Sequence, residues 1–273
     1  MPGPPAVGLA QWKENMRRFF ALIFCVLSIQ VFSCSIFKYL GSGNIYFCGN
    51  EDWTAKDPAI MSIEKTQNEY GVVLFGWESM LPNYPQAGIN SEGLCFDWAT
   101  VPAQKYIYES GKKNLTINST IAILKNCKTV DEVIRYIESN NFSHLAEEHL
   151  IIADKSGKSC VIEYTKGKKH IIVEANKNQY ITNFNLTDKE SGWYPCERYA
   201  ILDKRLNDEN QKQNDLRDIL NSVHQEGTFP TIYSYIFDLK NLSIKVFYNH
   251  NFTKYQEYDI RDIIKKGRMI SIH

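Results

Sequence analysis

The chain has 273 residues, of which 44% are hydrophobic, 13% aromatic and 23% charged, a composition typical of a folded globular protein. It excludes a disordered chain, a collagen and a polytopic membrane protein. Lys and Arg together number 31, as do Asp and Glu, so the chain lacks the basic excess that neutralises phosphates, and we expect no nucleic-acid partner. The seven Cys show no C-x-x-C or Cys/His spacing, so we expect no metal and no cofactor.

The first 33 residues have the pattern of a secretory signal. Two arginines precede the run Phe19–Phe32, which has only two polar members. A bilayer-spanning helix needs about 20 apolar residues, whereas a basic start, a short apolar run and a small residue at the cleavage site define a signal peptide. Ser33 is that small residue. We predict that residues 1–33 are a signal peptide, with Met16 as a possible true start, and that the rest is exported; an uncleaved signal anchor is the alternative.

Cleavage after Ser33 makes Cys34 the first residue of the mature protein. Either V-F-S-C (Val31–Cys34) is a lipobox whose cysteine carries acyl chains, or the freed α-amine and the thiol of Cys34 form a catalytic unit. A terminal amine with a pKa of about 7.7–8.0 accepts a proton at neutral pH. Phe32 is bulky for a lipobox. The segments that follow have to decide between the two interpretations.

Residues 34–273 contain no repeat, low-complexity stretch or linker, so we expect one domain. Short apolar runs bounded by turn residues predict strands, and helical spacing of apolar residues predicts helices. Runs of strands that alternate with runs of helices predict an α+β layered architecture with antiparallel sheets. In chain order we expect strands at 35–39, 45–48 and 70–77, helices at 120–126 and 130–138, strands at 150–153, 159–164, 170–175 and 179–183, helices at 196–206 and 214–224, strands at 231–238 and 243–248, and a basic tail.

Four segments of the chain carry a pattern when they are taken together. C-S-I-F-K-Y, which begins at Cys34, is followed by a Gly-rich turn and by I-Y-F-C-G-N-E-D-W-T, Ile45–Thr54. Then come G-I-N-S-E-G-L at Gly88–Leu94, I-T-N at Ile181–Asn183 and E-R-Y at Glu197–Tyr199. In this order they resemble the choloylglycine hydrolase and penicillin V acylase family of N-terminal nucleophile hydrolases.

The resemblance implies a four-layer αββα sandwich with the nucleophile at the start of a central strand. Cys34 would supply the thiol and, through its α-amine, the base. By match to the family, Asp52 would hold the α-amine over the sulfur, Asn183 would donate to the oxyanion, and Arg198 would favour the thiolate by its charge. Asn185 is an alternative to Asn183, and a purely structural role is the alternative for each of these residues.

The chain departs from the family pattern in two places. Many members carry an Arg three residues before the Asp that matches Asp52, where this chain has Gly49, or Asn50 if the gap is moved. Near the family's second oxyanion donor the chain reads F-D-W-A-T, so the side-chain donor is either absent or partly replaced by Thr100. Because of these departures, a specificity for bile salts or for penicillin V does not follow from the resemblance. Candidates for a substrate pocket are the aromatic residues Trp53, Trp77, Tyr84 and Trp98, together with Thr100.

The sequence therefore predicts an exported amidohydrolase that cleaves a linear amide through an acyl thioester on Cys34. The expected partner is a small-molecule amide: an N-acyl amino acid, a conjugated bile salt, a penicillin V-like compound or an acylated signal molecule. The alternatives are an acyltransferase on the same site and an inactive lipoprotein anchored through Cys34. A membrane is a partner only if that cysteine is lipidated. The sequence is compatible with a monomer and with a homo-oligomer.

Overall fold

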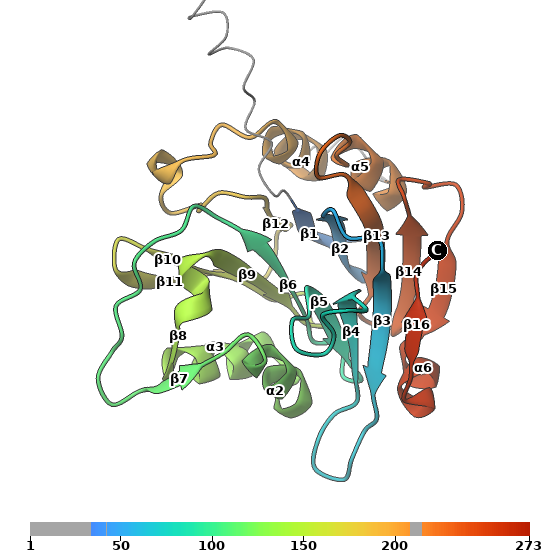
Figure 1. Ribbon diagram of the computed structural model, residues 1–273, viewed down its shortest axis with the longest axis horizontal. Helices are drawn as coiled ribbons and strands as arrows, with labels where there is room; N and C mark the ends of the chain where they lie inside the picture. The colour runs from blue at the N-terminus through green and yellow to red at the C-terminus, as the bar shows by residue number, and fades with distance from the viewer. Residues whose placement is uncertain (1–33, 42, 208–214) are drawn as a thin grey trace, which may run out of the picture. The chain divides into compact units, whose positions relative to one another are not determined.

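The computed structural model describes residues 34–41, 43–207 and 215–273, so the predicted signal peptide lies outside the described residues. Two large sheets with antiparallel pairing dominate the fold (Figure 1). The six-stranded sheet has the order β12-β1-β2-β13-β14-β15. Its strands are β1 (Ser35–Leu40), β2 (Ile45–Asp52), β12 (Gln179–Ile181), β13 (Thr231–Asp238), β14 (Ser243–Tyr248) and β15 (Gln256–Asp259).

The second large sheet has eight strands in the order β11-β10-β9-β6-β5-β4-β3-β16. A short parallel pair, β7 (Lys113–Leu115) with β8 (Asn140–Phe142), lies apart from it. The strands of the eight-stranded sheet are β3 (Pro58–Ile63), β4 (Val72–Trp77), β5 (Ala87–Asn90), β6 (Cys95–Thr100), β9 (Glu148–Ala153), β10 (Ser159–Thr165), β11 (Lys168–Glu174) and β16 (Met269–Ser271).

Helices cover the outer faces of the two sheets, which gives the predicted αββα layering (Figure 1). Helices α2 and α3 pack on the eight-stranded sheet, and α4 and α5 on the six-stranded one. The helices are α2 (Ser119–Asn126), α3 (Val130–Glu138), α4 (Glu197–Asn207), α5 (Leu216–Ser222) and α6 (Ile260–Lys266), with short 3-10 turns at Ser143–Ala146 and Lys189–Ser191. None of the helices in the described part of the chain combines the length and apolarity needed to cross a bilayer.

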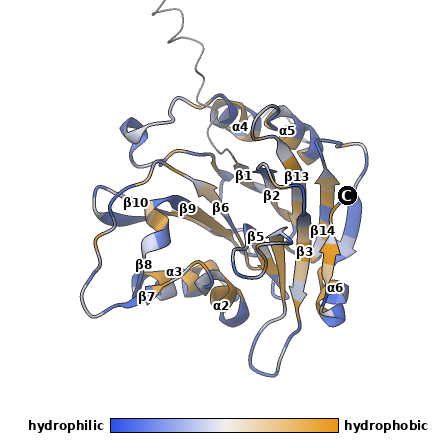
Figure 2. Cartoon of the chain, viewed as in Figure 1, coloured by the Kyte–Doolittle hydropathy of each residue, from blue (hydrophilic) through white to orange (hydrophobic). Residues whose placement is uncertain are grey.

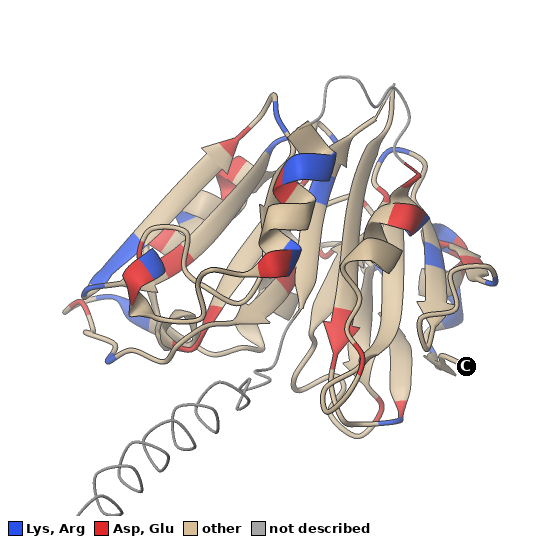
Figure 3. Ribbon diagram, turned by 90° about the horizontal axis from the view of Figure 1, so that it is seen from above, with Lys and Arg blue, Asp and Glu red and all other residues tan. Residues whose placement is uncertain are grey.

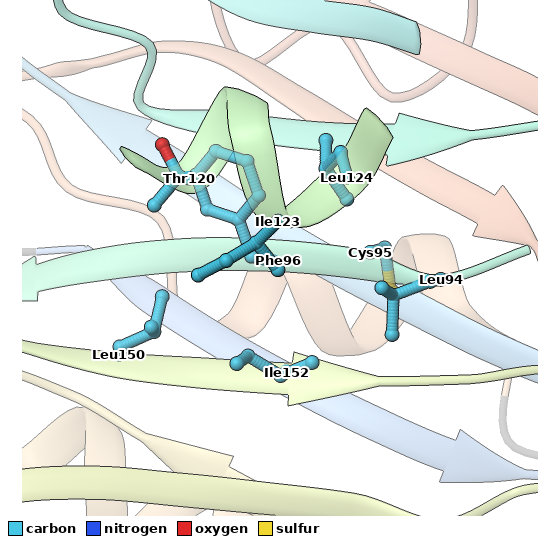
Figure 4. Close-up of a pocket in the computed structure, with 8 residues that line it drawn as sticks. All are labelled: Leu94, Cys95, Phe96, Thr120, Ile123, Leu124, Leu150 and Ile152. Atoms are coloured by element: carbon cyan, nitrogen blue, oxygen red, sulfur yellow. The ribbon is translucent and has the colours of Figure 1, made fainter. Parts of the chain in front are cut away.

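Three apolar cores separate the four layers, and Figure 2 shows the apolar residues concentrated on the strands. The central core joins the sheets through stacked rings such as Phe75 and Phe237, whose centroids are 5.1 Å apart. In the outer core beneath α2, Ile123 and Leu124 lie over Phe96 of β6 (Figure 4), and the contact leaves no space for a water molecule. Such close packing fixes the sheets as a rigid support for the site at one end of them.

Local sequence signals explain several element boundaries. The hydroxyl of Thr129 accepts from the backbone of Glu132, whose carboxylate accepts from the backbone of Thr129 in return. This capping box confirms the predicted start of α3. Asn90 closes the turn after β5, because its Oδ1 accepts from the backbone nitrogens of Glu92 and Leu94.

The expectation of a basic tail is wrong, because the last residues form α6 and β16. The carboxylate of Asp259 accepts from the backbone nitrogens of Arg261 and Asp262, and Gly267 ends the helix in the left-handed conformation. Both signals stand in the sequence, but the charge of the segment obscures its apolar face of three isoleucines. The sequence also fails to predict strands β3, β5, β6, β7, β8 and β15.

Candidate active site

Cys34 lies immediately before β1, at the end of the core between the two sheets, and is 8% exposed. Strand β1 runs between β12 and β2 in the six-stranded sheet. The thiol of Cys34 donates to Oε2 of Glu51 on β2, at 3.6 Å. The predicted nucleophile is thus held in a buried position against a carboxylate.

Asp52, the last residue of β2, is also buried, and its two oxygens differ in their contacts. The hydroxyl of Thr231 donates to Oδ1. Oδ2 lies 3.8 Å from Nη1 of Arg198 and has no hydrogen-bond partner among the described residues. Burial raises the pKa of Asp52 to about 8, against the opposing effects of Arg198 and Thr231. Oδ2 is therefore a buried acceptor that is free to bind a further donor.

Arg198, in the first turn of α4, connects three of the predicted residues. Nη1 donates to the backbone oxygen of Cys34 at 2.9 Å and to the hydroxyl of Ser35 at 2.7 Å. Nη2 donates to Oδ1 of Asn183 at 3.2 Å. These contacts fix the backbone at the nucleophile, so Arg198 positions Cys34 as well as supplying positive charge.

Asn183, which follows β12, is anchored at both ends of its amide. Its Nδ2 donates to the backbone oxygen of Thr100 at 2.9 Å, and its Oδ1 accepts from Arg198. Because an arginine only donates and a carbonyl only accepts, these partners define the orientation of the amide and leave one N–H of Nδ2 for a ligand. Asn185 is fully buried, and its amide has no partner among the described residues.

A second carboxyl group, that of Asp97 on β6, lies against Glu51 inside the central core. Both residues are almost fully buried. Burial raises the pKa of Glu51 to about 7 and, together with the charge of Glu51, raises the pKa of Asp97 well above its usual range. The hydroxyl of Tyr235 donates to Oδ2 of Asp97. Two carboxyl groups in contact inside a protein share a proton, because both cannot be charged there.

This environment disfavours the thiolate in the described structure. Burial raises the pKa of Cys34, and the charges of Glu51, Asp52 and Asp97 raise it further. A backbone hydrogen bond from Asp52 opposes them. Cys34 therefore needs either a proton acceptor or an additional positive charge before it can act as a nucleophile.

A cavity of about 350 Å³ opens next to Cys34 and Asp52. The sequence-predicted pocket residues Trp53, Trp77, Tyr84, Trp98 and Thr100 all line it, together with Met80, Gln86 and Glu148. The rings of Trp53 and Trp77 are stacked, with their centroids 6.4 Å apart. The structure thus brings every one of these sequence candidates to the same cavity as the predicted nucleophile.

One wall of the cavity is polar. The hydroxyl of Tyr84 donates to Oε1 of Glu148 at 3.2 Å, and Nε2 of His144 is 2.8 Å from Oε2 of the same carboxylate. The ring of His144 also packs edge-on against Trp98, with centroids 5.0 Å apart. This hydrogen-bonded group, Tyr84, His144 and Glu148, places an acidic side chain at the edge of an aromatic surface.

Sequence reasoning missed Glu51, Asp97 and Glu148. Asp97 did offer a signal, since an Asp in the middle of the apolar run C-F-D-W is unusual for a strand. Glu51 could be noticed only as the neighbour of Asp52, and Glu148 lacked any motif. Among the described residues no cluster of His, Cys, Asp and Glu could hold a metal ion, and the cysteines Cys34, Cys48, Cys95, Cys127, Cys160 and Cys196 are all free thiols.

A family model described as acyl-coenzyme A:6-aminopenicillanic acid acyl-transferase matches residues 40–252 of the chain. The chain belongs to this family. Its members include N-terminal nucleophile amide hydrolases and acyltransferases, so the chain is an enzyme of the class that acts on amides. No curated protein matches its sequence.

Solved structures confirm the predicted fold. Conjugated bile acid hydrolase from Clostridium perfringens superposes with a TM-score of 0.65 at 18% identity, over 88% of this chain and 96% of the hydrolase. Penicillin V acylase from Agrobacterium tumefaciens gives 0.64 at 18% identity, over 87% and 90%. The Caenorhabditis elegans orthologue of N-acylethanolamine-hydrolyzing acid amidase gives 0.50 at 14% identity, over 76% and 93%. All three are similar to this chain in fold.

Proposed function

We propose that the chain is exported, loses residues 1–33 and hydrolyses a linear amide through an acyl thioester on Cys34. In the acylation step the sulfur attacks the amide carbon, the thiol proton passes to the α-amine, and the C–N bond breaks as that proton reaches the leaving amine. Water then attacks the thioester and restores the thiol. The candidate substrates are those that the sequence indicates, from N-acyl amino acids to acylated signal molecules.

The observation that carries this proposal is the free oxygen Oδ2 of Asp52. It is buried, lies beside Cys34 at the cavity and lacks a hydrogen-bond donor among the described residues. A released α-ammonium at Cys34 would supply both the donor and a positive charge among three carboxyl groups. That charge would lower the pKa of the Cys34 thiol and of Asp52, which the described structure holds high.

Asn183 is the proposed donor to the oxyanion that develops during acylation and deacylation. One N–H of its side-chain amide is held by Thr100, and the other remains available to a developing oxyanion. Arg198 fixes the amide from its other end and binds the backbone oxygen of Cys34. In this proposal Asn183 stabilises the tetrahedral transition states. Arg198 holds the nucleophile and the oxyanion donor in fixed positions relative to each other.

Acyl transfer is the second candidate, because the matching family model describes an acyl-transferase. The thioester on Cys34 would then be taken by an amine in place of water. An inactive lipoprotein is less compatible with the geometry. Its diacylglyceryl group would have to leave a thiol that is 8% exposed and bonded to Glu51.

The test is the intact mass of the mature protein combined with trapping of the intermediate. We expect a chain that starts with an unmodified Cys34. A brief incubation with an activated acyl ester should then add one acyl group to the N-terminal peptide, and hydroxylamine should remove it. Retention of residues 16–33 or a lipid mass on Cys34 would refute the free-amine mechanism. Amines added in competition with water separate the two candidates, since a transferase forms the new amide in preference to the acid.

A further inference from the structure

We propose that the cavity selects amides without a negative charge close to the scissile bond, so that the substrates are acylated neutral or cationic amines. The inference rests on the proposed function and narrows its substrate class. It removes N-acyl amino acids, conjugated bile salts and penicillin V-like compounds from the preferred substrates, because in all of them the amine half carries an acid.

The first step of the argument is the charge of the cavity wall. Two residues with ionisable acidic side chains line it, Asp52 and Glu148, and no Lys or Arg does so among the described residues. Behind Asp52, the sulfur of Cys34 contacts Glu51, which lies against Asp97. Even with one proton shared between that pair, the reacting sulfur has carboxyl groups on several sides.

The nearby positive groups are already engaged, and in the proposed function the α-ammonium of Cys34 is bound to Oδ2 of Asp52. Arg198 binds the backbone of Cys34, the hydroxyl of Ser35 and the amide of Asn183, and lies 3.8 Å from Asp52. His144 bonds to Glu148, so any charge it carries is compensated there. A substrate carboxylate at the scissile bond would therefore meet acidic groups and no free basic side chain to bind it, in a site where burial reduces screening.

Position 49 shows why such a basic side chain is missing beside the sulfur. The sequence pattern that the chain resembles often has an arginine here or, if the gap is moved, at the next position, and this chain has Gly49 and Asn50. A Cβ atom at Gly49 would lie 2.5 Å from the hydroxyl oxygen of Tyr235. Tyr235 therefore occupies the space of a longer side chain and uses its hydroxyl to bind Asp97. The acidic pair and the glycine therefore belong to one packing arrangement, in which Tyr235 binds Asp97 and leaves no room for a basic side chain at position 49.

The apolar surface of the cavity favours the same substrates. Trp53, Trp77 and Met80 line it, and the two indoles are stacked. The face of an aromatic ring is the negative side of its quadrupole, so it attracts cations and tolerates neutral groups. Glu148 at the edge of this surface adds a hydrogen-bond acceptor for the hydroxyl or ammonium of an amine.

The experiment compares amides that share one acyl group and differ in the charge of a two-carbon amine. N-decanoyl ethanolamine is neutral, N-decanoyl ethylenediamine is cationic and N-decanoyl glycine is anionic. This charge is only a few bonds from the amide, so it lies near Cys34 whichever half of the substrate enters the cavity. We expect kcat/KM for the neutral and cationic amides to exceed that for the glycine amide at least tenfold, with a smaller ratio at high salt.

Two variants test whether the selectivity between these amides arises from the acidic wall of the cavity. Glu148→Gln keeps the shape of the cavity wall but removes its carboxylate. We expect it to reduce the ratio of kcat/KM between the neutral amide and the glycine amide at least threefold. The control Asp131→Asn removes an exposed carboxylate of α3 that binds Lys158 and lies outside the cavity, so it should keep the wild-type ratio. Equal or faster hydrolysis of the glycine amide by the wild-type protein overturns the inference while leaving the proposed function intact. Failure to hydrolyse any of the amides in a Cys34-dependent manner refutes the proposed function, and the selectivity with it.

Discussion

The sulfur of Cys34 lies 3.6 Å from Oε2 of Glu51, so the predicted nucleophile is hydrogen-bonded to a buried acid. Glu51 in turn lies against Asp97 in the central core, and burial raises the pKa of both carboxyl groups. A buried acid pair is stable only with its proton, because the charged pair cannot be solvated there. The state of this pair therefore couples the stability of the central core to pH.

We predict that Glu51→Gln makes the protein less sensitive to alkaline pH. The folded-state pKa of Glu51, about 7, is raised by burial above the value of 4.5 in the unfolded chain. Its contribution to stability is therefore complete below pH 4.5 and is lost as the pH rises through 7. Between pH 5 and pH 8 the free energy of unfolding should fall by roughly 1–3 kcal/mol more in the wild type than in the variant.

Thermal melts at pH 5 and pH 8 measure this difference, with Glu138→Gln as the control. Glu138 ends α3 and is exposed, so its substitution should reproduce the wild-type dependence on pH. A dependence in Glu51→Gln equal to that of the wild type would show that the acid pair does not retain its proton on folding.

We predict that Cys34→Ala abolishes amide hydrolysis and that Cys34→Ser retains at most a trace of it. A serine hydroxyl is far less ionised than a thiol, and the surrounding carboxyl groups disfavour an alkoxide even more. Steady-state rates with a neutral N-acyl amide measure the loss. Near-UV circular dichroism checks that both variants are folded, and substantial activity in folded Cys34→Ala would point to another nucleophile.

The fold was predictable from the sequence where local signals and long-range packing agree. The capping residue Thr129 and the apolar spacing of 130–138 define α3 without any knowledge of its partners. The layer order came from the resemblance carried by Cys34, Asp52, Asn183 and Arg198. The structure brings these residues together, because Arg198 binds the backbone oxygen of Cys34 and the amide of Asn183 and lies 3.8 Å from Asp52.

The remaining parts depend on contacts that a local pattern cannot show. Strand β6 contains Asp97, a residue type that is disfavoured in strands. It is accommodated by long-range contacts with Glu51 and with the hydroxyl of Tyr235, which is 138 residues away and donates to it. Glu148 reaches the cavity through its hydrogen bonds to Tyr84 and His144, from separate segments. No spacing in the sequence brings such residues together, so the acidic character of the site emerged only from the structure.

We predict that Gly93→Ala destabilises the protein more than Gly111→Ala does. Both glycines have φ of +81°, so the two substitutions incur the same backbone strain. A Cβ at Gly93 would lie 2.6 Å from the backbone oxygen of Leu239, whereas one at Gly111 meets nothing within 4 Å. We expect a loss of about 1 kcal/mol at Gly111 and at least about 1–2 kcal/mol more at Gly93.

Urea denaturation of the two variants, at one pH, gives this comparison. The difference between the two losses of unfolding free energy measures the steric clash at Gly93, since the cost of the left-handed conformation is the same in both variants. Equal losses would mean that the turn at Gly93 moves away from Leu239 without cost, and that the contact between the turn and the six-stranded sheet is not rigid.

Finally, we predict that Asp52→Asn and Asn183→Ala impair catalysis in different ways. In the proposed mechanism Asp52 holds the α-amine that accepts and returns the thiol proton, so its loss should change the pH profile of both acylation and deacylation. Asn183 acts on charge that exists only in the transition states, so its loss should lower kcat by about 10²–10³-fold and change KM little.

Pre-steady-state kinetics with a chromogenic amide separate the two steps, and a series of pH values gives both profiles. Asn183→Asp is the informative companion: it keeps the volume but replaces the donor to Thr100 and to the oxyanion by an acceptor, so it should be at least as damaging as the alanine. If Asn183→Ala raises KM alone, Asn183 binds substrate or supports the loop instead. The oxyanion would then have to be held by other donors near Thr100, and the match of the I-T-N segment to the family would carry no catalytic meaning here.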